Sequence, residues 1–421
     1  MAPSEMNIVL ITRFYPPDTG GGGIAAYASY MAKGLKAAGH QVRVISAMGA
    51  QSRHRTIVDG IEVYRIKPLA IPYRYHRIPV VGRYLRFIND ILYAWEVRQQ
   101  LLRVAKEQRP DIAEYADIDA EAIFHPSHLC PAVVKLHTPH FVLRPFYAER
   151  ELPYDTNSVA WIEKKAVRKA SGISSPSRSL AEIVALEYNL PSTYCEYVPN
   201  PIDTESFSPS PALDQGDTVL YVGRLERLKG ADTFAQAIPV VAPQFPHSKF
   251  VFLGADRYGP DGTSQQAALE TFLRKRGLTD KVKFQGHAPP EVFLDSYRQA
   301  AIVVVPSRYE NCPYTLLEAM ACGKPIVVSR AYGMEEMLVD GESGLFFRPG
   351  DATDLAEKIS RLLESKSLRQ HLGAGARRAA LERYALPVAT ELTISFYHSV
   401  LSSSTKDAAV GSNRSLSWTR S

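Results

Sequence analysis

Short runs rich in valine and isoleucine alternate with helical patterns along this chain, and the alternation occurs twice. The first series runs from "MNIVLITRFYPP" to "GISSPS" and ends near residue 196, and the second begins at "TVLYVGRL" near residue 218. Strands that alternate with helices predict parallel sheets with crossover connections. Two such series predict an α/β protein of two Rossmann-like domains, whose parallel sheets face each other across a cleft.

The domain boundaries follow from length and composition. A chain of 421 residues exceeds what one hydrophobic core usually organises. Residues 197–217 are rich in proline, serine and aspartate and are typical of a linker. We predict a first domain over 1–196, this linker, a second domain over 218–384, a helix over 385–402 that packs back on the first domain, and a disordered tail over 403–421.

The composition indicates a soluble globular protein, with 45% hydrophobic and 22% charged residues. The net charge of +5 is too small to argue for a nucleic-acid partner. The four cysteines form neither a C-x-x-C pair nor a zinc-binding spacing, which favours a reducing compartment. The N-terminal stretch has the features of neither a signal peptide nor a membrane span. We therefore predict a cytoplasmic protein.

Two glutamates flank the start of a helix in "SRYENCPYTLLEAMACGKPIV". Glu310 follows the buried strand "AIVVVPS", at the strand end where open α/β sheets bind ligands. Glu318 lies inside the helix, where its carboxylate could accept two hydrogen bonds from a vicinal diol such as a ribose. We expect free amides near Tyr314, Thr315 and Leu316 to hold a phosphate between the two. The alternative is a surface helix with two solvated glutamates.

Two cations follow the first strand of the second domain in "YVGRLERLKG". Arg224 can bind two phosphate oxygens in a fork, and Lys229 acts as a point charge. A solvated basic loop is the alternative for this pair alone. Both patterns fall at equivalent places in one domain, which favours a nucleotide diphosphate that carries a sugar.

These motifs, with "TRFYPPDTGGGGIAAYASYMAKGLKAAGHQV", "VKLHTPH", "VPNPID" and "GMEEMLVDGESGLFF", resemble the group 1 retaining glycosyltransferases of the GT-B fold. The resemblance spans nearly the whole chain except the serine-rich tail. It implies an acceptor-binding first domain and a nucleotide-sugar-binding second domain. The implied activity is that of a hexosyltransferase-type enzyme (EC 2.4) in glycan, exopolysaccharide or glycolipid synthesis. The donor base, the sugar and the acceptor stay open.

The resemblance also implies roles for single residues. Glu318 would hold the nucleotide ribose, Glu310 a hydroxyl of the transferred sugar, and His137 would lie beside the donor sugar, so Glu310 and His137 are the candidate catalytic residues. The family usually has glycine after the first glutamate, so Asn311, Cys312 and Pro313 predict a differently shaped sugar pocket. The expected donor contacts are Gly22, Gly23, Arg224, Lys229, Asn311, Cys312, Tyr314, Thr315 and Glu318, with base contacts at Gly286 and His287.

Two further patterns could indicate a cofactor site. The glycine run 20–23 is not a dinucleotide fingerprint, and we interpret it as a flexible loop that faces the donor phosphates and acceptor. A tight connection that needs only backbone freedom is the alternative. Asp117 and Asp119 form a "DID" sequence, which we interpret as a structural loop or, together with Glu114, as an acceptor contact. We expect neither a metal nor another cofactor.

The stretch between Arg65 and Arg109 interleaves arginine with apolar and aromatic residues. It predicts either a helix packed on its own sheet or a peripheral contact with the inner membrane face and a lipid-linked acceptor. The expected partners are a nucleotide-sugar donor and a sugar, polysaccharide or lipid-linked acceptor. A disaccharide synthase or phosphorylase of the same fold, and a non-catalytic sugar-nucleotide-binding protein, are the alternative functions.

Overall fold

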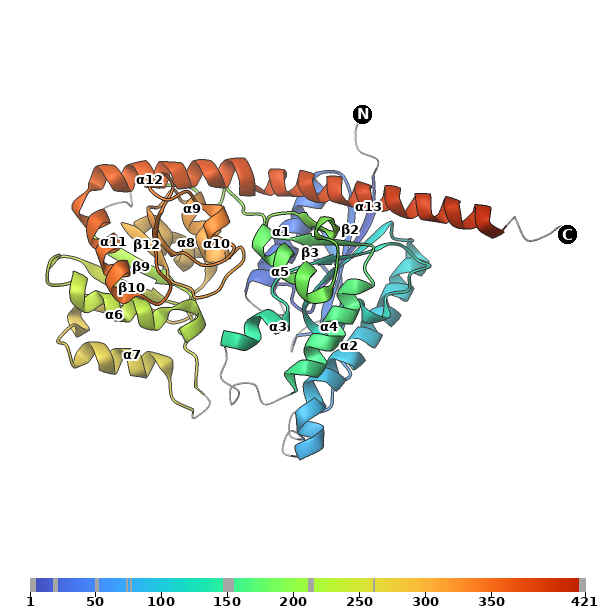
Figure 1. The fold of residues 1–421 in the computed structure, drawn as a ribbon, viewed down its shortest axis with the longest axis horizontal. Coiled ribbons are helices and arrows are strands. Elements are labelled where there is room, and N and C mark those ends of the chain that lie inside the picture. The colour runs from blue at the N-terminus through green and yellow to red at the C-terminus, as the bar shows by residue number, and fades with distance from the viewer. Residues whose placement is uncertain are drawn as a thin grey trace. The chain divides into compact units, whose positions relative to one another are not determined.

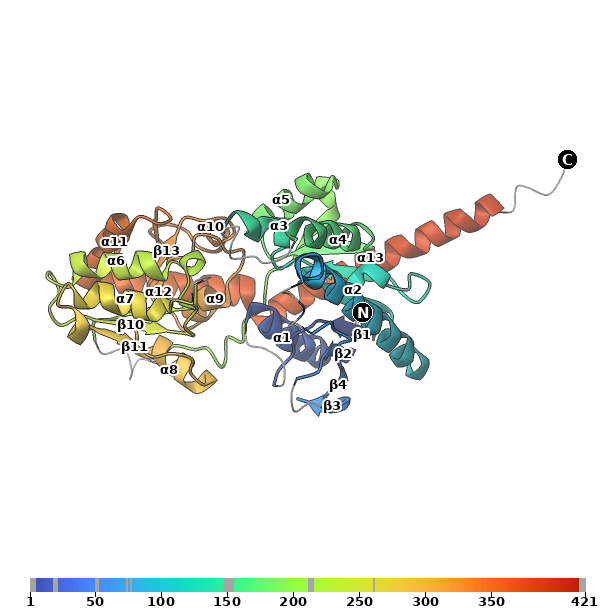
Figure 2. The ribbon, with the colours of Figure 1, turned by 90° about the horizontal axis from the view of Figure 1, so that it is seen from below.

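The chain forms two compact α/β units, and each holds one sheet. The computed structural model describes residues 5–17, 22–49, 53–72, 75, 78–146, 155–210, 216–259 and 262–415. The first unit comprises Met1–Pro201 and Pro387–Ser421, and the second comprises Ile202–Leu386. Helices cover both faces of each sheet (Figures 1 and 2). The prediction of two Rossmann-like domains with parallel sheets is confirmed.

The sheet of the first unit has eight strands in the order β3-β4-β2-β1-β5-β6-β7-β8, all parallel except for the β3–β4 pair. Strand β1 therefore lies between β2 and β5, and the loops that follow β1, β5 and β6 leave the sheet at one edge. The strands are β1 Asn7–Ile11, β2 Gln41–Ala47, β3 Arg55–Val58, β4 Ile61–Ile66, β5 Ile112–Ala116, β6 Ala132–Lys135, β7 Gly172–Ser175 and β8 Cys195–Tyr197. The helices are α1 Gly23–Ala37, α2 Pro79–Glu107, α3 His140–Leu143, α4 Thr156–Arg168, α5 Arg178–Tyr188 and α13 Leu386–Ser415.

An antiparallel hairpin forms the edge of this sheet, and the sequence analysis did not predict it. The turn between β3 and β4 is Asp59–Gly60, with φ of 51° and 73°. Positive φ at both central residues is what a two-residue hairpin turn requires, and an Asp-Gly pair supplies it at low cost. The Asp-Gly pair between "RTIV" and "IEVYRI" was the signal that would have identified the hairpin.

The sheet of the second unit has six parallel strands in the order β11-β10-β9-β12-β13-β14. Its core is rich in phenylalanine, and the rings of Phe234 and Phe252 lie 4.9 Å apart. The strands are β9 Thr218–Val222, β10 Lys249–Leu253, β11 Val282–Phe284, β12 Ile302–Val305, β13 Ile326–Ser329 and β14 Leu345–Phe347. The helices are α6 Ala231–Val241, α7 Gln265–Arg274, α8 Pro290–Gln299, α9 Tyr314–Ala321, α10 Met334–Met337, α11 Ala352–Glu364 and α12 Lys366–Ala379.

The predicted linker differs from what the structure shows. Residues 202–210 pack on the second unit: Ile202 forms a β-bridge with Ala385, and the Arg377 guanidinium donates to the carbonyl oxygen of Phe207 at 2.8 Å. This stretch is rich in proline and serine and has no hydrophobic periodicity. Its contacts with the second unit run through backbone carbonyls, so the sequence contains no pattern that predicts them. Residues 211–215 lie outside the described part of the chain.

Helix α13 packs on the first unit. Its Tyr397 hydroxyl donates to Glu114 Oε2 at 2.8 Å, and a Cβ on Gly172 would lie 2.6 Å from Val400. The helix continues to Ser415, through part of the predicted disordered tail, because adding a residue to an existing helix is easier than starting a new one. Residues 416–421 are not described. No helix in the described part of the chain combines the length and apolar character needed to cross a membrane.

Candidate active site

The loops that carry the two predicted motifs of the second unit meet at one edge of its sheet. Strand β9 lies between β10 and β12, so the carboxyl ends of β9 and β12 flank the point where the strand order reverses. The Arg308 amide donates to the Leu228 carbonyl at 2.8 Å and joins the two loops. Gly230 has a φ of +73°, and a Cβ there would lie 2.0 Å from the Pro306 carbonyl oxygen. Glycine at this position permits the contact.

Lys229 and Glu310 form an ion pair across these loops. Their side chains are 23% and 18% exposed, so the pair is shielded from solvent only in part. The structure thus brings together a residue of each predicted motif. Because each side chain balances the charge of the other, an anion that binds Lys229 competes with Glu310 for it.

Arg224 lies on the same edge but pairs with a different acid. Its guanidinium lies 2.8 Å from Glu226 Oε1, and Glu226 Oε2 lies 3.5 Å from Arg257 Nε. The Leu225 amide donates to the Ala255 carbonyl at 2.9 Å, which holds the loops after β9 and β10 together. The sequence analysis missed Arg257. A cation in the loop that follows the strand of "SKFVFLGADRY" is the signal that would have pointed to it.

Helix α9 begins after Pro313, which is its N-cap residue. The amides of Leu316 and Leu317 both donate to the Pro313 carbonyl at 3.1 Å. The expectation that the Leu316 amide is free for a phosphate is therefore wrong, because this amide closes the first turn of the helix. Thr315 is half-buried, and Tyr314 is buried.

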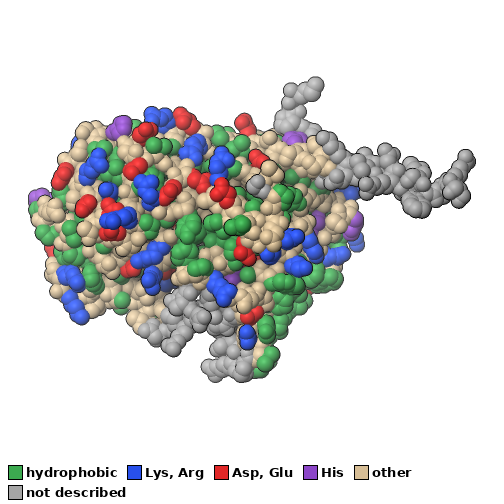
Figure 3. Space-filling view, in the orientation of Figure 1, with side chains coloured by type: hydrophobic (Ala, Val, Ile, Leu, Met, Phe, Trp, Pro, Cys, Tyr) green, Lys and Arg blue, Asp and Glu red, His purple; other side chains and the backbone are tan. Residues whose placement is uncertain are grey.

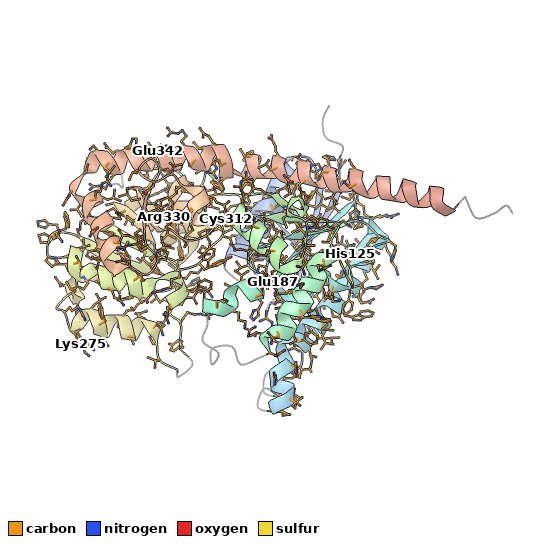
Figure 4. All side chains as sticks on the ribbon, viewed as in Figure 1. His125, Glu187, Lys275, Cys312, Arg330 and Glu342 are labelled. Atoms are coloured by element: carbon orange, nitrogen blue, oxygen red, sulfur yellow. The ribbon has the colours of Figure 1, made fainter. Side chains whose placement is uncertain are left out.

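The segment between Glu310 and the helix is buried and fixed from two sides. Asn311 and Cys312 are buried, and Asn311 Oδ1 accepts a hydrogen bond from Tyr309 at 2.9 Å. A Cβ on Gly333 would lie 2.0 Å from the Asn311 carbonyl oxygen, so the loop after β13 packs directly on this segment. Figure 4 labels Cys312 and Arg330, which follow the neighbouring strands β12 and β13. These contacts restrict the conformation of the segment.

Glu318 lies one turn into α9 and is half-buried. Burial raises the pKa of Glu318 to about 7, and a hydrogen bond from the Tyr297 hydroxyl opposes this rise. That bond, from α8, ends on Glu318 Oε2 at 2.7 Å. Oε2 thus already accepts one hydrogen bond, and the carboxylate keeps further acceptor capacity for the diol that the sequence analysis expects.

Gly286 and His287 lie at the same edge as the loops after β9 and β10. The Gly254 amide donates to the Gly286 carbonyl at 2.9 Å, and Gly286 has a φ of +67°. His287 is exposed, with its ring 6.4 Å from that of Phe293. The predicted base contacts therefore follow β11, two strands away from β9.

His137 follows β6 in the first unit, and it contacts Tyr27 of α1 edge-on with ring centroids 5.2 Å apart. Burial, together with the charge of Lys135, lowers the pKa of His137 to about 3. The imidazole is therefore neutral throughout the physiological range of pH. The Tyr27 hydroxyl donates to Glu114 Oε1 at 2.9 Å, so the contact is fixed by a buried carboxylate.

The glycine run precedes α1. Gly22 caps this helix with a φ of +124°, and Gly23 is its first residue. A Cβ on Gly22 would meet no atom within 4 Å, so the backbone angle and not the space demands glycine. Gly20 and Gly21, which belong to the same predicted loop, lie outside the described residues.

The "DID" sequence forms a buried charge cluster. Asp119 has a φ of 64° and forms ion pairs with Arg13, at 3.0 Å, and with Arg86 of α2. Burial raises the pKa of the Asp117 carboxyl to about 7. Within the described residues, no group of three or more histidine, cysteine, aspartate or glutamate side chains could hold a metal ion. Asp119 thus contacts α2 directly through Arg86, and Arg13 lies 3.2 Å from Asp90 of the same helix.

Comparisons with known proteins agree with this arrangement. Residues 21–206 match the model of "Glycosyltransferase Family 4", and residues 203–379 match that of "Glycosyl transferases group 1". An uncharacterized glycosyltransferase from Methanocaldococcus jannaschii is 24% identical over 93% of this chain and 98% of its own.

Solved structures share the fold. Sucrose-phosphate synthase from Thermosynechococcus elongatus has a TM-score of 0.79 at 21% identity, covering 95% of this chain and all of its own. Anabaena HepE in complex with UDP and glucose has a TM-score of 0.70 at 18% identity, covering 93% of this chain and 99% of its own. The two units thus have the GT-B architecture.

Proposed function

The chain belongs to the group 1 glycosyltransferases, and we propose that it moves a sugar from a nucleoside-diphosphate sugar to an acceptor hydroxyl with retention of the anomeric configuration. The single observation that carries the proposal is the Lys229–Glu310 ion pair at the carboxyl ends of β9 and β12. A lysine for the diphosphate and a carboxylate for a sugar hydroxyl stand side by side there. Transfer in glycan, exopolysaccharide or glycolipid synthesis is the role that we infer.

In this proposal the main requirement of catalysis is to stabilise the negative charge that develops on the leaving diphosphate. The glycosidic C–O bond breaks, and its electron pair goes to the diphosphate oxygen. Arg224, Lys229 and the N-terminus of α9 stabilise that charge, a preorganised electrostatic effect. These positive groups take the place of a metal ion, so we propose that transfer needs none.

The acceptor hydroxyl attacks the face from which the diphosphate leaves, and its proton passes to a leaving phosphate oxygen. Glu310 accepts a hydrogen bond from a sugar hydroxyl once the diphosphate has taken its place on Lys229. We assign the orientation of sugar and acceptor to His137, which is neutral at physiological pH and can donate or accept one hydrogen bond through each ring nitrogen.

A screen of UDP-, GDP- and ADP-sugars tests the proposal, first by thermal stabilisation and then by sugar release or transfer. Binding of the donor must raise the apparent stability of the protein. Lys229→Ala and Glu310→Gln should each lose most of the transfer activity while folding normally, and near-wild-type turnover in either would overturn these roles. Turnover with inorganic phosphate or with small free sugars would instead favour the phosphorylase or synthase alternative.

We also propose that the first unit meets an anionic membrane surface. Arg65 and Arg86 serve internal contacts, because Arg65 donates to the Tyr15 carbonyl at 2.8 Å and Arg86 pairs with Asp90 at 2.9 Å. Trp95 of α2 is 47% exposed, with the guanidinium of Arg98 5.5 Å from its ring.

Trp161 of α4 is 55% exposed, and its ring lies 5.5 Å from the Lys165 ammonium. Hydrophobic side chains with lysine and arginine beside them follow α2 on the face shown in Figure 3. An exposed aromatic beside a cation suits the headgroup region of anionic lipid. Cosedimentation with vesicles that contain phosphatidylserine, but not with pure phosphatidylcholine vesicles, is expected. Equal sedimentation with both would contradict the proposal.

A further inference from the structure

A buried tyrosine of α8 holds the carboxylate of Glu318. Tyr297 is fully buried, and its hydroxyl donates to Glu318 Oε2 at 2.7 Å. The same hydroxyl lies 3.3 Å from the carbonyl oxygen of Thr315, in the first turn of α9. Tyr297 therefore ties α8 to the start of the helix that carries Glu318.

The two ends of this contact have different surroundings. Tyr297 has no exposed surface, whereas Glu318 is half-buried, so the carboxylate connects the interior with the surface of the second unit. Oε2 receives its hydrogen bond from the interior. Fixing one oxygen fixes the plane of the carboxylate, and this bond leaves Oε1 to a ligand. A hydrogen bond weakens steeply once its angle at the hydrogen falls below about 120°, so the orientation of the carboxylate decides which hydroxyl is reached.

We infer that Tyr297 is a positioning residue, which aims Glu318 Oε1 at one hydroxyl of the donor's ribose. The inference rests on the proposed function, because it deepens the role given to Glu318. Its consequence is that the two ribose hydroxyls contribute unequally to binding. A carboxylate that rotated freely could offer its two oxygens to the two hydroxyls with equal ease, whereas a carboxylate whose Oε2 holds the hydrogen bond of the tyrosine offers Oε1 preferentially.

Calorimetric binding of UDP, GDP and ADP, and of the 2′-deoxy and 3′-deoxy forms of the tightest binder, tests the inference. For the wild type, removing one of the two hydroxyls should weaken binding about tenfold or more, and removing the other about threefold or less. Tyr297→Phe should weaken binding of the parent nucleotide about tenfold. For the deoxy form that lacks the hydroxyl bound by Glu318, Tyr297→Phe should change the affinity by less than about twofold relative to the wild type.

Tyr397→Phe is the matched control, because it removes the same kind of bond, from a buried tyrosine to the buried carboxylate of Glu114, in the other unit. It should leave the preference between the two deoxy forms unchanged. An equal loss by Tyr297→Phe for the parent and for both deoxy nucleotides would show a structural effect only and would overturn the inference. Equal losses on removing either hydroxyl from the wild type would do the same.

Phe207→Leu keeps the inference testable if Tyr297→Phe does not fold. The Phe207 ring contacts that of Tyr297 edge-on, with centroids 6.4 Å apart, so this variant loosens the tyrosine without removing its hydroxyl. This variant should weaken binding of the parent nucleotide about threefold and leave binding of the deoxy form that lacks the hydroxyl bound by Glu318 unchanged. An equal change in affinity for all three nucleotides would overturn the inference. Absence of binding of every nucleotide to the wild type would overturn the proposed function and this inference with it.

Discussion

Replacing Glu310 with glutamine is expected to strengthen the binding of a nucleoside diphosphate that carries no sugar, although the variant loses transfer. In the structure the Glu310 carboxylate is the ionic partner of Lys229. A diphosphate competes with this carboxylate for the lysine, so the energy of the ion pair opposes binding. Glutamine keeps the size of the side chain and removes the competing charge.

The magnitude follows from the exposure of the pair. Two unit charges about 4 Å apart attract each other by about 4 kcal/mol at an effective dielectric constant of about 20, and by about 1 kcal/mol in water. Side chains that are about one-fifth exposed lie between these limits. Ordering and desolvating the two groups reduces the net value to about 1–2 kcal/mol. The Kd of the nucleoside diphosphate should therefore fall about five- to thirtyfold in Glu310→Gln.

Titration calorimetry at fixed ionic strength measures this change, with the nucleoside diphosphate that stabilises the wild type most. Lys229→Met supplies the control, because the competition disappears with the cation. In that background, Glu310→Gln should change the Kd by less than about twofold. An unchanged or weaker affinity in a folded Glu310→Gln single variant would refute the argument that the carboxylate competes with the phosphate.

Three further outcomes are expected. A Cβ on Gly230 would clash with Pro306, whereas one on Gly277, at a similar φ of +70°, meets nothing within 4 Å; Gly230→Ala should therefore destabilise the protein by about 2–4 kcal/mol and Gly277→Ala by only about 1 kcal/mol in urea unfolding. The folded protein holds His137 with a pKa of about 3, whereas the unfolded chain takes up this proton near pH 6.5. Stability should fall as the pH drops from about 6.5 towards about 3, and His137→Gln should flatten that fall in urea titrations. Transfer should be unchanged in excess EDTA, and a loss that Mg²⁺ restores would contradict the proposed use of Arg224 and Lys229 in place of a metal.

The elements could be predicted from the sequence because their signals are local. Runs such as "AIVVVPS" have the composition of a buried parallel strand. The position of each motif relative to the end of its strand follows from the number of residues between them. Lys229 and Glu310 meet because parallel strands place their carboxyl ends at one edge, a rule that needs no knowledge of side chains. This is why a contact between residues from two distant loops was within reach of the sequence.

Other contacts depend on how side chains pack, and the hydrophobic periodicity of the sequence does not predict that packing. Tyr297 reads as one more apolar position of α8, and only the packing of α8 on α9 shows that its hydroxyl ends on Glu318. Arg257 shares Glu226 with Arg224 because two loops are joined by backbone hydrogen bonds. The amide of Leu316 is consumed by the turn geometry after Pro313, which residue types alone do not fix.

The charge balance of the second unit connects binding with recognition. Lys229 is balanced by Glu310, while Arg224 and Arg257 share Glu226, so the two carboxylates offset most of the repulsion among the cations at this sheet edge. On the proposed function, donor binding is then an exchange of ionic partners. This exchange is favourable because a diphosphate carries more negative charge than a single carboxylate. It also has more oxygens that a guanidinium can bind in a fork. The exchange also frees Glu310 for a sugar hydroxyl only when a diphosphate occupies Lys229, so the phosphates and the sugar are recognised together.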